Sequence, residues 1–220
     1  MKSDQDILST LSSAKLFKSF TKDSLTDVLS LLDGKIASMH SKESLYKEGN
    51  IVSTIGCVLS GEIVVSSYNP SGKEILMTKL HKGDTFGANI AFTTTQISPY
   101  FFYSARSSTI YSFKISKLRK LPAKYSSILY ENLLNQLSND SIKHQYRIDI
   151  LCQKNANLRI LSYLKQQQNK RNTDEFCIPY NREEMANYLC LNRSVLSHQL
   201  SLLQQEGYIE FKNNYFKILK

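Results

Sequence analysis

The residues with the most distinctive chemistry follow Asn192. Leu196, Leu200 and Leu203 recur there at spacings of four and three, which predicts a helix with one buried apolar face. The opposite face carries short polar and basic side chains: Arg193, Ser194, Ser197, His198 and Ser201. An arginine can bond bidentately to guanine, a histidine can donate to major-groove acceptors, and serines allow close approach to bases and phosphates. We interpret this face as a surface that reads DNA.

A second helix is predicted just before this one, and the two would form a helical hairpin. Asn181 is followed three residues later by Glu184, which is the capping-box pattern of a helix start. The apolar face of this first helix is formed by Met185, Ala186 and Leu189. The segment 190–192 breaks the pattern, and we expect Asn192 to cap the second helix.

The end of the chain predicts a β-hairpin that turns at Asn213-Asn214, with Lys212 and Lys217 on its strands. Such a hairpin beside two helices makes a winged helix-turn-helix, and we assign Arg182 and Lys212 to the DNA-binding set as well. The alternative is an ordinary helical hairpin with no DNA-binding role, and the wing argues against it.

Short β-branched and aromatic runs, separated by glycines, occupy residues 44–115 and predict an antiparallel β domain. The clearest hairpin has strands 62–68 and 73–77 around the turn 69–72, Asn-Pro-Ser-Gly. Regular spacing of such strands favours a barrel or jelly roll. Apolar residues spaced by three and four across 7–32 predict short amphipathic helices that cap this domain.

A long helix is predicted after Pro122. The spacing along it alternates between four and three residues, as in a coiled-coil seam formed by Tyr130, Leu134, Leu137, Ser141, His144, Ile148 and Leu151. We expect two copies of the chain to pair along this seam. The alternative is a helix packed only on its own β domain, through a second face formed by Ile128, Leu129, Leu133 and Ile142.

Composition limits the function classes. The 220 residues are 41% hydrophobic and 21% charged, as in a folded globular protein, and no apolar run is long enough to span a membrane. No secretory signal pattern is present, so we expect a cytoplasmic protein. The net charge of +9 suits a polyanionic partner. The four cysteines are scattered and the four histidines are isolated, so no metal site is expected.

The order of these motifs resembles the cyclic-AMP receptor/FNR (CRP/FNR) superfamily of bacterial transcription regulators over nearly the whole chain. The matching segments are 60–65, 72–75, 82–87, the long helix, 182–198 and 205–209. The resemblance implies an α+β protein with an N-terminal antiparallel β-roll, which is a jelly roll like that of cyclic-nucleotide-binding domains. A long dimerisation helix and a C-terminal winged helix-turn-helix would follow. It also implies a homodimer on a palindromic double-stranded DNA operator, with RNA polymerase as a further partner.

The resemblance places an effector pocket at Phe86, Gly87, Ala88, Ser98, Tyr100 and Phe102. Members that bind a cyclic nucleotide carry a Glu for the ribose and an Arg for the phosphate, where this chain has Ala88 and Ser98. A buried phosphate would then lack a charged partner, so we do not expect cyclic AMP to bind. Arg106 could substitute from the same strand, and the aromatic run 100–103 suits either an apolar effector or a covered strand.

No cofactor is expected. The cysteines do not cluster as an iron-sulfur site requires, while His81 or Cys57 as a haem ligand stays open. The rival class is a cupin-like metal-binding protein or enzyme built on the β-roll, but no H-x-H pair or catalytic motif supports it, and we expect no enzymatic activity.

The domain boundaries are expected at 1–117 for the β-roll, 118–151 for the long helix and 152–220 for the winged helix-turn-helix. Four properties stay open at this stage: the effector, the operator sequence with its target genes, activation against repression, and whether the DNA-binding state carries the effector.

Overall fold

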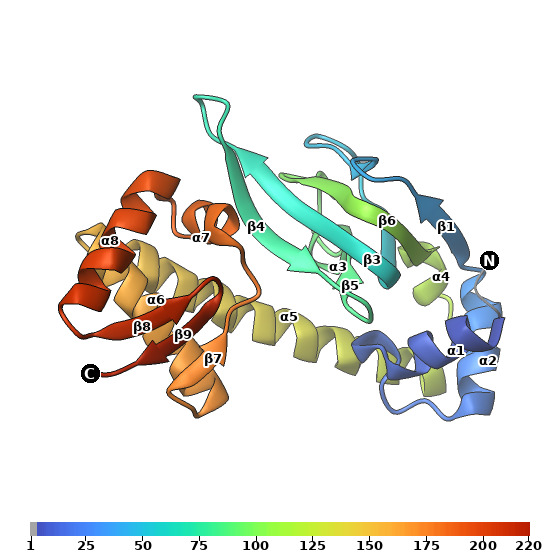
Figure 1. The fold of residues 1–220 in the computed structure, drawn as a ribbon. Helices are drawn as coiled ribbons and strands as arrows, with labels where there is room; N and C mark the ends of the chain where they lie inside the picture. The colour runs from blue at the N-terminus through green and yellow to red at the C-terminus, as the bar shows by residue number, and fades with distance from the viewer. Residues whose placement is uncertain (1–3) are drawn as a thin grey trace. The chain divides into compact units, whose positions relative to one another are not determined.

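The computed structural model describes residues 4–220 and divides into two compact units. One comprises the chain up to Tyr68 together with Met77–Asp140, and the other comprises Asn69–Leu76 and Ser141–Lys220. The boundary at 140/141 falls inside the long helix α5 (Ala123–Leu151), which Figure 1 draws in yellow. Each unit is described separately.

The first unit is built on one antiparallel sheet with the strand order β1-β6-β3-β4, while β2 pairs with β6 and β5 pairs with β3 (Figure 1). Its strands are β1 (Lys35–Met39), β2 (Ser44–Tyr46), β3 (Thr54–Tyr68), β4 (Glu74–Leu80), β5 (Thr85–Phe86) and β6 (Phe101–Lys114). The predicted antiparallel β domain and its hairpin at the 69–72 turn are confirmed. Asn69 holds that turn, because its Oδ1 accepts hydrogen bonds from the backbone N–H groups of Ser71 and Lys73.

The long strands β3 and β6 bend where their register shifts, on either side of Ser60. Gly61 lies at this bend with φ of 85°, and a Cβ there would come within 2.1 Å of the Ser108 Oγ. Only glycine fits that position, because the backbone is left-handed and the neighbouring strand is too close.

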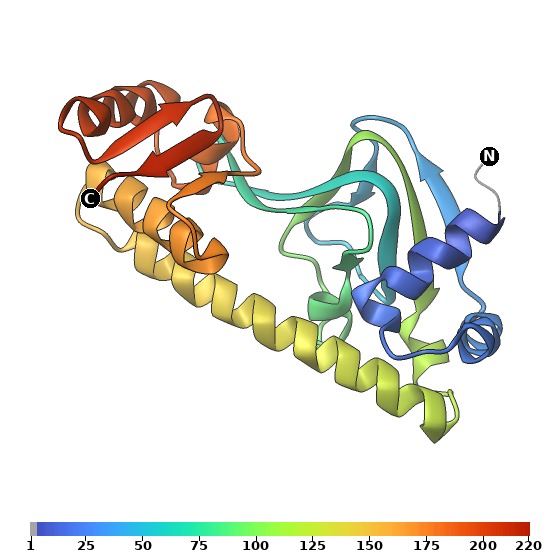
Figure 2. The same cartoon turned by 60° about the horizontal axis from the view of Figure 1, so that its bottom comes forward.

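The N-terminal segment forms α1 (Asp4–Ser13), a 3-10 turn (Lys15–Phe17) and α2 (Lys22–Leu32), which confirms the predicted short helices. They share a core with the first turns of α5, and Figure 2 shows them in blue beside that end of the helix. Asn132 of α5 fixes this packing, because its Nδ2 donates to the carbonyls of Leu16 and Lys18 at 3.0 and 2.7 Å. Two further helices of one turn, α3 (Ala88–Ala91) and α4 (Ile115–Leu118), flank β6 in the sequence.

The second unit holds α6 (Ala156–Arg171), β7 (Glu175–Cys177), α7 (Arg182–Tyr188), α8 (Arg193–Gln205), β8 (Ile209–Lys212) and β9 (Tyr215–Ile218). Its sheet has the order β7-β9-β8, and β8 and β9 form the predicted terminal hairpin around Asn213-Asn214. The helices enclose a core that includes Tyr163, Met185, Leu196, Leu200 and Phe216.

The long helix α5 has one apolar face that packs in the first unit, while the predicted seam is covered only in part: Leu137 is half-buried against the core of that unit, and Ser141 and His144 are exposed. Leu129 and Leu133 are buried in the core of the first unit, whereas Leu134 is 67% exposed and Ile148 is 58% exposed. Along the predicted second face, Ile142 is exposed and lies apart from that core. Among the described residues, no helix is long and apolar enough to cross a membrane.

Candidate nucleic-acid interface

The helix α7 begins as its sequence predicts. Asn181 accepts a hydrogen bond from the Glu184 N–H through Oδ1, and Glu184 accepts one from the Asn181 N–H through Oε2, both at 2.9 Å. These reciprocal bonds satisfy two backbone donors at the helix start, so the capping box is confirmed. Met185 and Ala186 are fully buried and attach α7 to the core of the second unit.

The start of α8 differs from the prediction in one respect. Asn192 occupies the N-cap position, but its side chain makes no capping hydrogen bond. Its Oδ1 instead accepts a hydrogen bond from the Lys73 Nζ at 3.3 Å, and the same ammonium donates to the Leu191 carbonyl at 3.3 Å. Lys73 belongs to the segment Asn69–Leu76 of the same unit. The amide oxygen therefore binds a distant lysine rather than the helix N–H groups.

The two faces of α8 are separated as the periodicity predicts. Leu196, Leu200 and Leu203 are fully buried in the core of the second unit. The side chains predicted to read DNA are all exposed, on the other face: Arg193, Ser194, Ser197, His198 and Ser201. The Ser201 Oγ donates to the Ser197 carbonyl at 3.1 Å. Between Arg193 and His198 this face carries the small side chains of Ser194 and Ser197, so the DNA can approach it closely.

The wing presents Lys212, which is exposed on β8 next to the Asn213 turn. Lys217 is engaged differently, because its Nζ lies 2.8 Å from the Glu175 carboxylate. This hydrogen bond lowers the pKa of Glu175 and raises the pKa of Lys217. Lys212 is therefore the more available of the two wing lysines for a phosphate.

Arg182 is half-buried, unlike the other predicted DNA-binding residues. Its Nη2 donates to the Asn213 carbonyl at 3.2 Å, across from α7 to the wing turn. Burial lowers the pKa of its guanidinium, and the positive charge of Arg193 adds to this.

The residues assigned to an effector pocket lie in and beside the core of the first unit. Phe86, Ala88, Ser98 and Phe102 are buried, and Tyr100 is half-buried. Gly87 precedes α3 with φ of 81°. Ser98 is 1% exposed, and its Oγ donates to the Tyr100 carbonyl and accepts from the Tyr100 N–H. Its hydroxyl is thus used within the chain.

Tyr46 packs against two of the residues assigned to the effector pocket, a contact that the sequence did not indicate. Its ring centroid lies 5.6 Å from that of Phe102 and 6.5 Å from that of Phe86, so three aromatic rings pack together inside the roll. A regular strand pattern places Tyr46 on β2 but does not reveal this contact, which joins segments far apart in sequence.

Basic side chains that could bind an anion lie on the sheet of the first unit, but they are not among the residues assigned to the effector pocket. Glu62 lies 3.1 Å from the Lys79 Nζ and 3.3 Å from the His81 Nδ1, and Arg106 is its exposed cross-strand partner on β6.

The thiol of Cys57 is buried, and burial together with the charge of Asp84 raises its pKa to about 12. Within residues 4–220, no three His, Cys, Asp or Glu side chains are grouped as metal ligands.

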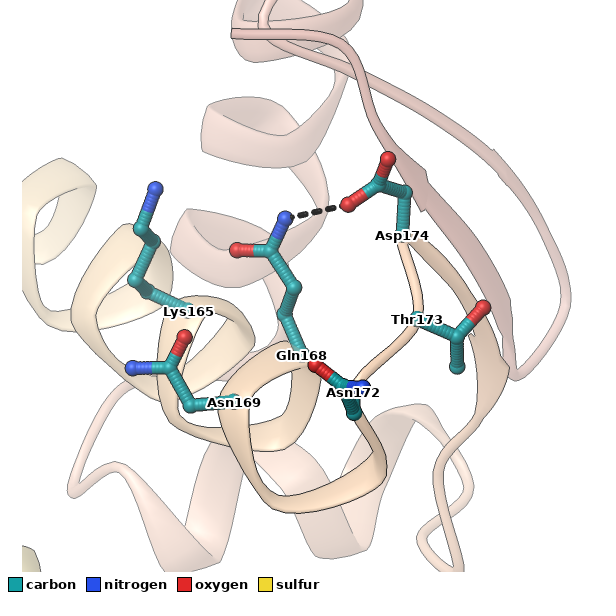
Figure 3. A pocket seen from close by; sticks show the side chains of 6 residues that line it. All are labelled: Lys165, Gln168, Asn169, Asn172, Thr173 and Asp174. Atoms are coloured by element: carbon teal, nitrogen blue, oxygen red, sulfur yellow. Dashed lines mark hydrogen bonds between the residues drawn. The ribbon is translucent and has the colours of Figure 1, made fainter.

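A polar depression of about 460 Å³ lies at the end of α6, remote in sequence from both predicted sites. Figure 3 shows its lining, which consists of Lys165, Gln168, Asn169, Asn172, Thr173 and Asp174. The Gln168 Nε2 donates to Asp174 at 2.6 Å, as the dashed line marks. This bond closes the turn between α6 and β7.

Comparison with known proteins matches two parts of the chain to two family models. Residues 37–125 match the model of the cyclic nucleotide-binding domain, and residues 158–220 match that of the Crp-like helix-turn-helix domain. The chain is 24% identical to Electron transport regulator A of Shewanella oneidensis, over 80% of this chain and 72% of that protein.

Solved structures share the fold. A mutant of CooA from Carboxydothermus hydrogenoformans has a TM-score of 0.73 at 18% identity, covering 100% of this chain and 94% of its own. FixK2 from Bradyrhizobium japonicum has a TM-score of 0.63 at 17% identity, covering 85% of this chain and 93% of its own. None of these findings supports the cupin-like alternative. With a cyclic nucleotide-binding domain followed by a Crp-like helix-turn-helix, the chain belongs to the CRP/FNR superfamily and is a transcription regulator of that type.

Proposed function

We propose that this regulator binds a near-palindromic DNA operator as a homodimer and reads base edges through the outward face of α8. The observation that carries the proposal is the division of α8 into a fully buried leucine face and an exposed face of Arg193, Ser194, Ser197, His198 and Ser201. A recognition helix contacts base edges in the major groove through residues near its N-terminus, and this face offers hydrogen-bond donors there.

Dimerisation is supported by the uncovered stripe on α5. Tyr130 and Leu134 are four residues apart and Ile148 follows fourteen residues later, which is two heptads, so the three lie along one stripe of the helix surface, and all are exposed. A second copy of α5 would cover this stripe. Twofold pairing places two recognition helices on half-sites about one helical turn, roughly 34 Å, apart.

The effector belongs to a class other than cyclic AMP. The ribose and phosphate ligands are replaced by Ala88 and Ser98, the Ser98 hydroxyl is already bonded, and the rings of Tyr46, Phe86 and Phe102 pack together in the core of the first unit. The protein acts in the cytoplasm, where its DNA is, as a regulator without catalytic activity. RNA polymerase is the further partner that the superfamily implies.

Selection of bound oligonucleotides from a random duplex pool tests the proposal. The expected result is an enriched motif with twofold symmetry and two half-sites about one helical turn apart. Enrichment of no motif, or of a single asymmetric site by a monomer, would contradict it.

A further inference from the structure

We propose that Arg182 positions the wing against the helix-turn-helix, so that its contribution to DNA binding is made through Lys212 rather than through a phosphate of its own. This inference rests on the proposed function only for its DNA measurements. The geometry that supports it lies entirely within the second unit.

The guanidinium of Arg182 lies over the aromatic rings of the wing. Its Cζ is 5.0 Å from the ring centroid of Phe211 and 5.9 Å from that of Phe216. These rings belong to paired residues on β8 and β9 and are stacked at 5.9 Å, with Phe216 fully buried. A planar cation over an aromatic face is favourable, and it places the first residue of α7 against both strands of the wing.

The same side chain also holds the turn of the wing. Its Nη2 donates to the carbonyl of Asn213, a residue in the left-handed region with φ of 55°. On the other side of the turn, the Ile178 N–H donates to the Asn214 carbonyl at 2.9 Å, and the Asn214 Nδ2 donates to the Ile178 carbonyl at 3.2 Å. The turn is therefore attached at two points, to Arg182 at the start of α7 and to Ile178 in the segment before it.

This attachment fixes the neighbouring lysine. Lys212 directly precedes Asn213, and its side chain is exposed. A phosphate contact by Lys212 gains affinity only if the wing is already held in place, since ordering a loose turn on binding costs conformational entropy. The hydrogen bond from the Arg182 guanidinium to the Asn213 carbonyl holds the turn of the wing in place before DNA binds.

Lysine would not replace Arg182 in this role. An ammonium is a point charge on a flexible stem and cannot lie flat on Phe211 while it donates to the Asn213 carbonyl. For a simple phosphate contact, by contrast, lysine is an adequate substitute. The Arg182→Lys variant therefore separates the two roles.

The first test needs no DNA. Hydrogen exchange of the backbone amides of residues 211–216 is measured by NMR in the wild type, Arg182→Lys and Arg182→Met. Loss of one cation–π contact and one hydrogen bond should raise their exchange about tenfold in both variants. Arg171→Met is the matched control, because it removes an arginine 5.7 Å from the ring of Phe176, on the strand β7 beside the wing, and leaves the contacts of Arg182 in place, so its wing amides should exchange as in the wild type. Unchanged exchange in both Arg182 variants would overturn the proposal.

The second test measures affinity for the selected DNA against salt concentration. Because the wing is loosened in Arg182→Met, adding Lys212→Ala should reduce DNA affinity less in that background than in the wild type. The Arg182→Lys protein should bind DNA as weakly as Arg182→Met. If the affinity losses of Arg182→Met and Lys212→Ala simply add in the double variant, or if Arg182→Lys keeps the wild-type affinity and salt slope, Arg182 contacts a phosphate directly and the proposal is overturned. If the wild type selects no DNA, the proposed function fails while the exchange experiment still decides the role of Arg182.

Discussion

The Glu183 Oε2 lies 3.9 Å from the Arg193 Nε, so a carboxylate of α7 faces the side chain that we expect to read a base. Both side chains are largely exposed, at 56% and 68%. An exposed ion pair at this distance contributes about 0 to 1 kcal/mol, so Arg193 is free to leave it for DNA at little cost.

Glu183→Gln should therefore strengthen DNA binding by up to about fivefold, because it removes both the competing carboxylate and a negative charge near the phosphates. Fluorescence anisotropy with the selected duplex measures this change. Glu210→Gln on β8 is the control for removal of one negative charge, and it should have a smaller effect. A Glu183→Gln protein that binds more weakly than the wild type would show that the carboxylate helps to orient Arg193.

Leu134→Asp should convert the dimer to a monomer. Leu134 is 67% exposed, so the substitution leaves the core of the chain intact but buries a carboxylate wherever a second copy of α5 covers this face. Light scattering after size exclusion measures the mass. Ile142→Asp is the control, because Ile142 is exposed on a different side of the helix and should leave the dimer in place. A wild type that is itself a monomer at micromolar concentration would contradict the proposed pairing.

Cyclic AMP should give no saturable heat in titration calorimetry. Ala88 and Ser98 offer neither a carboxylate for the ribose nor a cation for the phosphate, and both are buried. Saturable binding with a micromolar dissociation constant, roughly −8 kcal/mol, would contradict the account of the roll interior.

Thiol labelling should distinguish Cys57 from the other cysteines. Its thiol is buried and its pKa is raised to about 12, so the thiolate is scarce at neutral pH, whereas Cys152, Cys177 and Cys190 are exposed. Mass spectrometry after brief iodoacetamide treatment should show three modified cysteines in the folded protein and four after denaturation. Rapid modification of Cys57 in the folded state would mean that the first unit opens readily around β3.

Much of the second unit could be predicted from the sequence because its signals are local. The capping box at Asn181 and the leucine spacing on α8 involve residues three or four apart, and the structure has both as expected. Asn192 also lies where the pattern puts it, but its side chain binds Lys73, 119 residues away. No periodicity encodes such a contact.

The same distinction applies to the roles of single residues. Position and charge alone assign Arg182 to the DNA-binding set, and only the structure shows its guanidinium on Phe211 and Phe216. In the roll, the strands could be predicted from residue types, whereas the packing of Tyr46 on Phe102 depends on the pairing of β2 with β6.

The base preference of Arg193→Ala tests most directly whether α8 reads DNA. Loss of one bidentate contact should cost about 1 to 3 kcal/mol and relax the preference at one base pair in each half-site, while the rest of the motif is kept. The Lys212→Ala protein is the comparison, because a phosphate contact should weaken all sequences alike and lower the salt slope by about one. Random-pool selection with the wild type and both variants measures these preferences. An Arg193→Ala protein that selects the wild-type motif with undiminished preference at every position would contradict the assignment of α8 as the reader.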